Sequence, residues 1–441
     1  MANHQAFRHS RSHGRSHGCT RSRIHSRIHS RIRNWGIVAT IGFHTITSPA
    51  LFASPKVKEE QHRAASGVSC EIVPYALNLA EGIRGLKAKK EIPCRVYNKK
   101  QVRDYIQATI EEKLPKHRLK MEEYVYKTLG LIPLQFNYSS GLIDLYLSQI
   151  GGFYEPEDEF FAMAQWMPSL LQMPIAVHEL THGIQDQFYA LEKFLDPQTM
   201  STDETLARSA LVEGDATAVM LDYSRNLSGQ SSIATEESVT AVMLQNVFGV
   251  GLSSGFSDAP ESLKFLLIFP YTSGLRFSHA LMRRGGYKAI DSAFRSPPQT
   301  SREILHPELY LTKKSERSDS KSLRKRLLDA LEGETVAHED SLGEFAIALV
   351  LRELGLGHQE AAQLASGWRG DAVVVYEAQP SQFAMEWRFE VDSEGTAKAV
   401  FKTMMEGFRK RYESPAASEF QLEGQTISLT QDGRIIVLTR M

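Results

Sequence analysis

The sequence predicts an α+β protein with a mainly helical middle and a small α+β portion at its C-terminal end. Three observations support this fold class. Apolar residues over 169–194 and 201–227 recur with the period of a helix. Short pieces bounded by glycine and proline come before residue 169 and are typical of edge strands. Strand-like runs follow in 372–378 and 383–391.

Residues 1–53 are predicted to be a leader and not part of the fold. They contain eight Arg, no Lys and no acidic residue, and their apolar stretch ends in small residues at Ala53. A basic region, an apolar region and a small residue are the pattern of a secretory signal, so we expect an exported protein (periplasmic, extracellular or at the cell surface). A nucleic-acid-binding arm and a retained membrane anchor are the alternatives. His44 and Pro49 interrupt the apolar run and disfavour the anchor.

The remainder of the chain is mildly acidic, because it keeps 43 of the 51 basic residues and all 52 acidic residues. This balance gives no reason to expect nucleic acid as a partner. Contact with a membrane is expected only through an uncleaved leader. Cys70 and Cys94 remain as a pair beyond the leader, and either a disulfide or two reduced thiols is consistent with their positions.

Two folded portions are expected, over 54–330 and 331–441, because the stretch 312–327 is strongly charged and marks a boundary. Pro174 is expected in the first turn of the helix over 169–194. Ser201 or Thr202, followed by Glu204, is a start signal for the next helix. Further helices are predicted in 94–114 after an initial strand, and over 117–130, 236–250, 275–285, 341–354, 358–366 and 395–411, with a short one in 295–310.

The remaining strands are expected in two regions. Two or three strand-like pieces are predicted within 141–164, where Gly151–Gly152 and Pro156 separate them. A last hairpin is predicted in 426–441, because Asp432–Gly433 is a strong turn signal.

The stretch 177–187 reads VHELTHGIQDQ and contains the H-E-x-x-H signature. On a helix, positions i and i+4 lie on one face, so His178 and His182 can direct two imidazoles at one metal ion. Glu179 is turned by about 100° from His178 and can reach a water bound to that metal. The pattern predicts a single zinc ion with Glu179 as the general base, whereas an ordinary packed helix is the alternative.

A catalytic zinc keeps three protein ligands and one open position, so a third ligand must come from elsewhere. Glu213 on the following helix is the first choice, because Gly214 and Ala216 beside it permit close approach. Glu204 on the same helix and the more distant His306 are the rivals. Asp215 could orient a ligand histidine from behind, or it could be a solvated aspartate.

These residues resemble the gluzincins, zinc metallopeptidases whose metal is held by two histidines and one glutamate. The specific part of the resemblance is HELTH followed by a helix with EGDA, within residues 150–225. A wider similarity to exported bacterial H-E-x-x-H proteins extends over much of 95–395, through GGFYEPEDEFF, HELTHGIQDQ, LVEGDA, FPYTSGLRF, ILHPELY and GWRGD.

The resemblance implies a zincin-like core over 54–330, made of edge strands, the H-E-x-x-H helix and a glutamate-bearing helix. It implies that His178, His182 and Glu213 bind zinc and that Glu179 is the base. One departure concerns the thermolysin-like branch, in which an aspartate follows the ligand glutamate by four residues; Thr217 has that place here.

The expected reaction is hydrolysis of peptide bonds in a peptide or protein substrate. Residues 152–164 would then supply an edge strand for the substrate, or else form an ordinary core hairpin. Peptide hydrolysis also needs a donor for the developing oxyanion. Tyr271 and His306 rank first, because both lie beside proline at predicted turns. The other candidates for this donor are Tyr223 and His279.

Two other readings use the same residues. Glu179 and His182, with Glu303 and His306, form two Glu-x-x-His pairs of the kind found in di-iron bundles. Nearby prolines leave no room for a long helix at the second pair, which disfavours this reading. The chain could also be a non-catalytic exported protein that keeps the zinc fold as a binding module.

Overall fold

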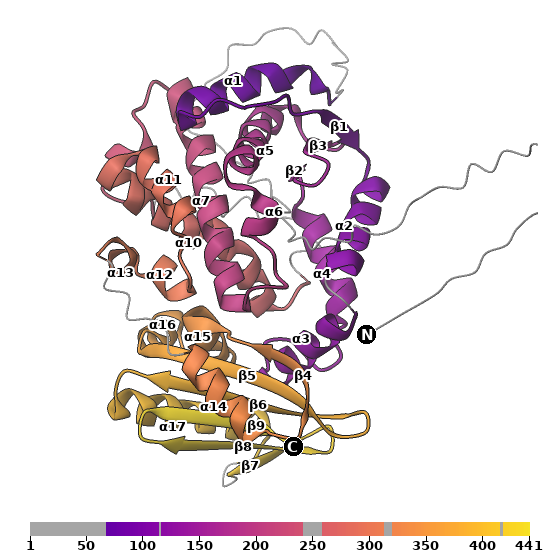
Figure 1. The fold of residues 1–441 in the computed structure, drawn as a ribbon, viewed down its shortest axis with the longest axis vertical. Coiled ribbons are helices and arrows are strands. Elements are labelled where there is room, and N and C mark those ends of the chain that lie inside the picture. Colours follow the sequence, from indigo (N-terminus) through magenta and orange to yellow (C-terminus); the bar gives the residue numbers. More distant parts are fainter. Residues whose placement is uncertain (1–67, 114–115, 241–257, 313–319, 415–417) are drawn as a thin grey trace, which may run out of the picture. The chain divides into compact units, whose positions relative to one another are not determined.

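The computed structural model describes residues 68–113, 116–240, 258–312, 320–414 and 418–441. These residues form an α+β fold with a small three-stranded sheet, many helices and a six-stranded sheet (Figure 1), so the α+β class is confirmed. The expected leader lies outside the described residues, as does most of the helix expected over 236–250. Within the described part of the chain, no helix is both long and apolar enough to cross a membrane.

The first elements build the three-stranded sheet and the helices near it. Strand β3 is central: it runs parallel to β1 and antiparallel to β2, so β2 forms an edge of this sheet. The elements are η1 (Cys70–Ile72), α1 (Val73–Arg84), β1 (Cys94–Tyr97), α2 (Lys99–Lys113), α3 (Lys116–Leu129), α4 (Tyr138–Gln149), β2 (Gly152–Glu155) and β3 (Phe160–Ala164).

The prediction of strand-like pieces is correct for β2 and β3 but wrong for residues 141–149. These residues lie in α4, which begins after Asn137, whose side chain accepts a hydrogen bond from Ser140 N at 3.0 Å. Such a cap satisfies a backbone donor that the helix itself leaves open. Tyr138 and Leu145 are buried on the same helix, so packing and the cap together outweigh the strand propensity of the sequence.

Two long helices follow, α5 (Ser169–Tyr189) and α7 (Thr202–Leu227), with the short α6 (Leu191–Phe194) between them. The predicted start of α7 is confirmed, since the Ser201 hydroxyl accepts from Glu204 N at 3.2 Å. The prediction of one helix over 169–194 is wrong at its end, because Ala190 adopts a left-handed φ of 52°. Pro174 also lies inside α5 and not in its first turn.

Helix α10 (Glu261–Gly285) packs tightly against α7. A Cβ atom added to Gly274 would lie 2.1 Å from the carbonyl oxygen of Ala210, and one added to Gly214 would lie 2.2 Å from the carbonyl oxygen of Gly274. The two backbones are therefore in direct contact at this crossing, where glycine is required. The neighbouring elements are η2 (Ile233–Thr235), α11 (Tyr287–Arg295), α12 (Ser301–Leu305) and α13 (Pro307–Leu311).

The C-terminal portion is a fully antiparallel sheet in the order β4-β5-β6-β9-β8-β7, with helices packed against it. The predicted turn at Asp432–Gly433 is confirmed, and Gly433 has a φ of 55°. The elements are α14 (Ser320–Ala330), β4 (Thr335–Asp340), α15 (Gly343–Glu353), α16 (His358–Ala365), β5 (Trp368–Gln379), β6 (Gln382–Val391), α17 (Glu394–Arg411), β7 (Glu419–Leu422), β8 (Gln425–Asp432) and β9 (Ile435–Arg440).

The charged stretch 312–327, predicted to mark a boundary, is only partly described. Residues 313–319 lie outside the described residues, but α14 begins at Ser320. Leu323 and Leu327 are buried against Ala372 of β5, so two leucines at helical spacing attach this charged segment to the sheet.

A disulfide joins Cys70 and Cys94, with 5.8 Å between their Cα atoms. It connects the segment that begins α1 to strand β1. Of the two alternatives that the sequence leaves open, the structure has the bridged one.

Replacing both cysteines, Cys70→Ser with Cys94→Ser, should lower the free energy of unfolding by about 3 kcal/mol, the chain-entropy value for closing a loop of this length. The bridged residues are 24 positions apart. Denaturant unfolding measures the change, and the wild type in a thiol reductant should unfold like the double variant. Equal stability of oxidised wild type and variant would contradict the prediction.

Gly274→Ala should lower the free energy of unfolding by about 1–3 kcal/mol, the usual cost of inserting a methyl group into a close-packed contact. The matched control is Gly285→Ala at the end of the same helix, where the added Cβ meets only Ala289 Cβ at 3.4 Å. The control should be neutral or slightly stabilising, because alanine is the better helix former. Equal effects of both variants in denaturant unfolding would disprove the close contact.

Candidate metal centre

Helices α5 and α7 bring three potential ligands into one buried cluster. His178 and His182 extend from the same face of α5, and Glu213 extends from α7. Their exposed fractions are 2 %, 0 % and 5 %. Glu204, the rival for the third position, pairs with Arg208 instead. It lies nine residues earlier on α7, about 13 Å along the helix axis.

The spacing of the three ligand atoms matches a zinc site. Glu213 Oε2 lies 3.2 Å from His178 Nε2 and 3.3 Å from His182 Nε2, and the two Nε2 atoms are 3.1 Å apart. Zinc bonds of about 2.0–2.1 Å in a tetrahedron would separate neighbouring ligand atoms by about 3.3–3.4 Å. The three residues therefore fit one zinc ion as three of its four ligands.

The proton positions in this cluster are set by burial and by the Glu213 charge. Burial lowers the pKa of His178, and this effect outweighs the hydrogen bond that His178 donates to the Glu213 carboxylate. Burial also acts to lower the pKa of His182, but the Glu213 carboxylate outweighs it and raises that pKa to about 9. Burial opposes ionisation of Glu213, yet the charge of His182 and the hydrogen bonds lower its pKa to about 2. The cluster without metal therefore holds one imidazolium–carboxylate pair.

Glu179, the predicted base, is fully buried beside the cluster and is attached to the edge strand. Its Oε2 accepts a hydrogen bond from the backbone N–H of Tyr154 at 3.0 Å. The hydroxyl of Tyr154 also donates to Asp186 at 3.0 Å, two turns further along α5. The Tyr154 N–H is thus directed away from β3 and at α5, the helix that carries both histidines.

The structure places only one of the proposed oxyanion donors against the cluster. The ring of Tyr271, on α10, stacks on the ring of His178 with 6.3 Å between centroids. His306 is instead at the junction of α12 and α13, where its Nε2 lies 2.7 Å from Glu344 Oε1. His279 Nε2 lies 3.1 Å from the carbonyl oxygen of Glu236, and Tyr223 packs in an apolar cluster near Val219. A role of His306 in catalysis remains a prediction without a supporting contact.

The second Glu-x-x-His pair does not join the first. Glu303 lies in the five-residue helix α12, and its Oε2 accepts from Gln299 N at 2.6 Å. His306 pairs with Glu344. Two such pairs must face one another to hold two irons, and none of these contacts leads to His182.

Sequence reasoning missed Gln185 and Arg84. Gln185 Oε1 lies 2.8 Å from His182 Nδ1, and its Nε2 donates to Asp215 at 2.9 Å. Arg84 also bonds to Asp215. The expected contact between Asp215 and a ligand histidine is thus made through Gln185. The sequence could have indicated Gln185, because it lies three residues after His182 on the same helix. It could not have indicated Arg84, because Arg84 and Asp215 are 131 positions apart.

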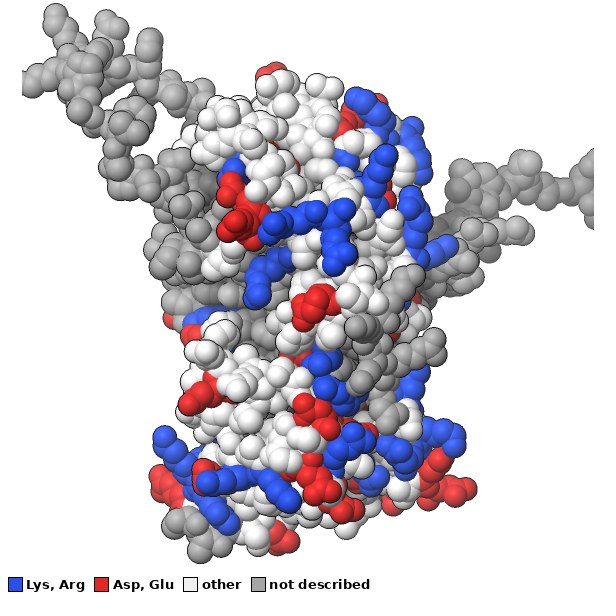
Figure 2. All heavy atoms as spheres, turned by 90° about the vertical axis from the view of Figure 1, so that its left-hand side faces the viewer, with Lys and Arg blue, Asp and Glu red and all other residues white. Residues whose placement is uncertain are grey.

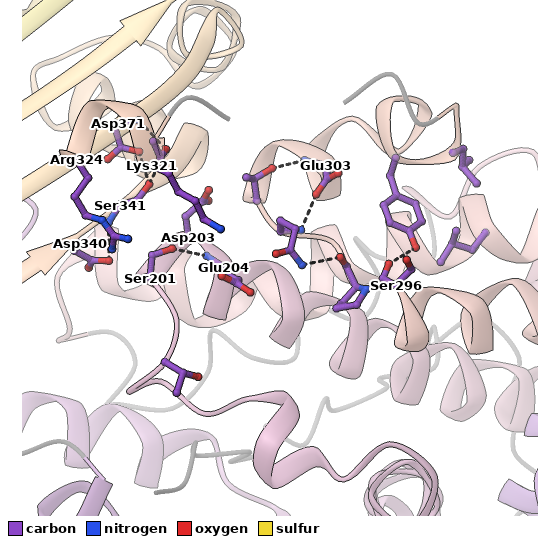
Figure 3. Close-up of a pocket in the computed structure, with 18 of the residues that line it drawn as sticks. Ser201, Asp203, Glu204, Ser296, Glu303, Lys321, Arg324, Asp340, Ser341 and Asp371 are labelled. Carbon is purple, nitrogen blue, oxygen red and sulfur yellow. Dashed lines mark hydrogen bonds between the residues drawn. The ribbon is translucent and has the colours of Figure 1, made fainter. Parts of the chain in front are cut away.

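A separate pocket of about 1280 Å³ lies at the beginning of α7 (Figure 3). No residue of the histidine cluster lines it. Its acidic side chains are engaged by the fold itself: Asp203 accepts from Ser301 N at 2.8 Å, and Asp340 accepts from Thr202 N at 2.7 Å. On the face shown in Figure 2, acidic and basic side chains lie interspersed. The histidine cluster is the site whose side chains together could hold a metal ion.

Comparison with known proteins places a family only on the C-terminal portion. A family described as a domain of unknown function (DUF8575) matches residues 331–440. No curated protein and no solved structure matches the chain. The matched residues contain the six-stranded sheet but none of the cluster, so the chemistry of the cluster rests on its own geometry.

Zinc binding near pH 7.5 should release about one proton per protein. In the metal-free protein the pKa of His182 is about 9, so its ring is protonated at this pH and must lose that proton to bind a metal. Calorimetric titrations in two buffers of different ionisation enthalpy measure the release. The released proton should disappear near pH 10, and a heat that is independent of the buffer at pH 7.5 would contradict the prediction.

Proposed function

We propose that this protein is a single-zinc metallopeptidase of the gluzincin type. The observation that carries the proposal is that His178, His182 and Glu213 converge with the spacing of three zinc ligands. Glu179 lies next to them on the same helix. A helix with two ligands, a second helix with the third and an edge strand along the first form the arrangement that the gluzincin resemblance implies.

A bound zinc ion would polarise the scissile carbonyl and lower the pKa of a bound water to about 7. Glu179 would accept a proton from the attacking water and deliver it to the leaving amine. The N–H of Tyr154 holds one oxygen of Glu179 and so fixes the plane of its carboxylate. Tyr271, whose ring lies against His178, is the proposed donor to the developing oxyanion.

The substrate class proposed is a peptide or protein. Strand β2 pairs with β3 on one side only, and its other edge follows α5. An extended peptide that bonded to the backbone groups of this edge other than the Tyr154 N–H, which Glu179 occupies, would pass beside Glu179 and the cluster. The Cys70–Cys94 bridge supports the proposed export, because disulfides persist in oxidising compartments.

Burial of the cluster favours a second candidate, a non-catalytic protein that holds zinc for structural reasons. His182 and Glu179 are 0 % exposed, and a structural zinc needs no access for a substrate. Both candidates use the same three zinc ligands. They differ in whether Glu179 acts as a general base.

Elemental analysis and peptide-library hydrolysis of the full chain test both candidates. The wild type should hold one zinc, and Glu213→Ala should lose it or bind it far more weakly. Glu204→Ala, a matched change on the same helix, should keep it. Glu179→Gln should keep the zinc and lose at least about a hundredfold in hydrolysis rate, since a positioned general base contributes about 10²–10⁴-fold.

Each contrary result has a distinct meaning. Zinc in the wild type without hydrolysis of any peptide would favour the structural candidate. Hydrolysis that persists in Glu179→Gln would remove Glu179 as the base. A wild type that takes up no zinc, after refolding in its presence, would overturn both.

A further inference from the structure

We propose that Gln185 is a positioning residue that fixes the two ligand helices relative to each other, and that Asp215 and Arg84 hold it in place. The inference rests on the proposed zinc site and names what controls its affinity. It concerns residues that contact no substrate and act through His182 and Glu213.

Gln185 is not itself a proposed ligand, yet its side chain bonds to both ligand-bearing helices beside the cluster. Its Oε1 lies 2.8 Å from Nδ1 of His182, and its Nε2 donates to the carbonyl oxygen of Val212 at 3.1 Å. Val212 directly precedes Glu213 on α7. A fully buried side chain thus connects the ring of one ligand to the backbone beside another.

The orientation of this amide follows from its neighbours. The Nε2 group faces Val212 O and the carboxylate of Asp215, at 2.9 Å, and both of these only accept hydrogen bonds. A flipped amide would direct Oε1 at two acceptors. With Oε1 therefore facing His182, the imidazole must donate from Nδ1, so Nε2 is the nitrogen that can offer a lone pair to a metal once it is deprotonated.

Asp215 is held by a buried arginine from the distant helix α1. Arg84 Nε donates to Asp215 at 2.9 Å, and another guanidinium nitrogen of Arg84 donates to Asp291 at 2.7 Å. Asp215 is 0 % and Arg84 2 % exposed. A buried carboxylate without a partner is costly, and the Arg84 guanidinium supplies that partner to Asp215 behind the amide. The hydroxyl of Tyr189 donates to Asp291 at 2.7 Å and completes the chain.

In the part of the chain that the structure describes, His178 has no equivalent hydrogen bond behind its ring. We therefore expect Gln185 to have the larger effect on the geometry of the cluster. The Nδ1 atom of His178 has no hydrogen-bond partner among the described residues, and the ring is packed against Tyr271. The orientation of His182 and its distance from Glu213 therefore depend on the chain from Gln185 to Arg84. Loss of such an outer partner typically weakens metal binding by about 10–100-fold.

The test is zinc affinity, measured by chelator competition on the purified full chain. Gln185→Met keeps the size of the side chain and removes both hydrogen bonds, and it should weaken zinc binding about 10–100-fold. The matched control is Gln187→Met on the same helix, whose amide contacts only Lys89 and Lys90. The control should bind zinc like the wild type. Equal affinity of Gln185→Met and wild type would overturn the inference.

A second variant keeps the inference testable if Gln185→Met does not fold. Arg84→Lys keeps the positive charge but cannot reach Asp215 and Asp291 together with separate groups, so it should weaken zinc binding by about 3–10-fold, less than the loss of an outer partner itself. Asp291→Asn should weaken it less, because Arg84 remains on Asp215. Wild-type affinity in Arg84→Lys would overturn the role of Arg84.

The results separate this inference from the proposed function. If the wild type binds zinc but hydrolyses no peptide, a weaker Gln185→Met still supports the positioning role, and only the peptidase fails. If hydrolysis is observed and Gln185→Met binds zinc normally, only the positioning role fails. A change in the denaturant midpoint of the metal-free protein with unchanged zinc affinity would indicate a merely structural glutamine and overturn the inference. A wild type without zinc would overturn both.

Discussion

The buried group of charges between α5 and α7 is the constraint on which the rest of this fold depends. Glu213, Asp215 and Glu179 lie at or below 5 % exposure inside the protein, where an unpaired carboxylate is costly. His182 offsets the charge of Glu213, Arg84 that of Asp215, and a backbone N–H of β2 contacts Glu179. The sheet edge and helix α1 are thus both fixed by the same polar centre, although they lie far apart in sequence.

Close backbone packing determines what else can approach that centre. The α7–α10 crossing brings Gly274 against Ala210, and three residues before Gly274 the ring of Tyr271 reaches His178. A larger residue at the crossing would separate the helices and remove the aromatic wall of the cluster. Packing and chemistry are therefore coupled here, because the residue after Glu213 is Gly214, which belongs to the same contact.

The proposed peptidase and the proposed positioning chain use separate faces of the same helices. Toward the edge strand, Glu179 and Tyr154 form the side on which a peptide could lie. On the other side of His182, Gln185 and Asp215 form a buried polar support. Such a division permits the support to tune metal affinity without changing the groups that react.

The sequence alone determined the local features: the i, i+4 histidines, the Ser201 cap, the Asp432–Gly433 turn and the expectation that Glu213, and not Glu204, meets the two histidines. These depend on helical period, short-range hydrogen bonds and small flanking residues, all of which can be read within a few positions. Tertiary structure decided that Arg84 lies behind Asp215, and burial together with the Asn137 cap decided that residues 141–149 are a helix. Those outcomes depend on burial against distant segments, and a single sequence does not specify which distant segments meet.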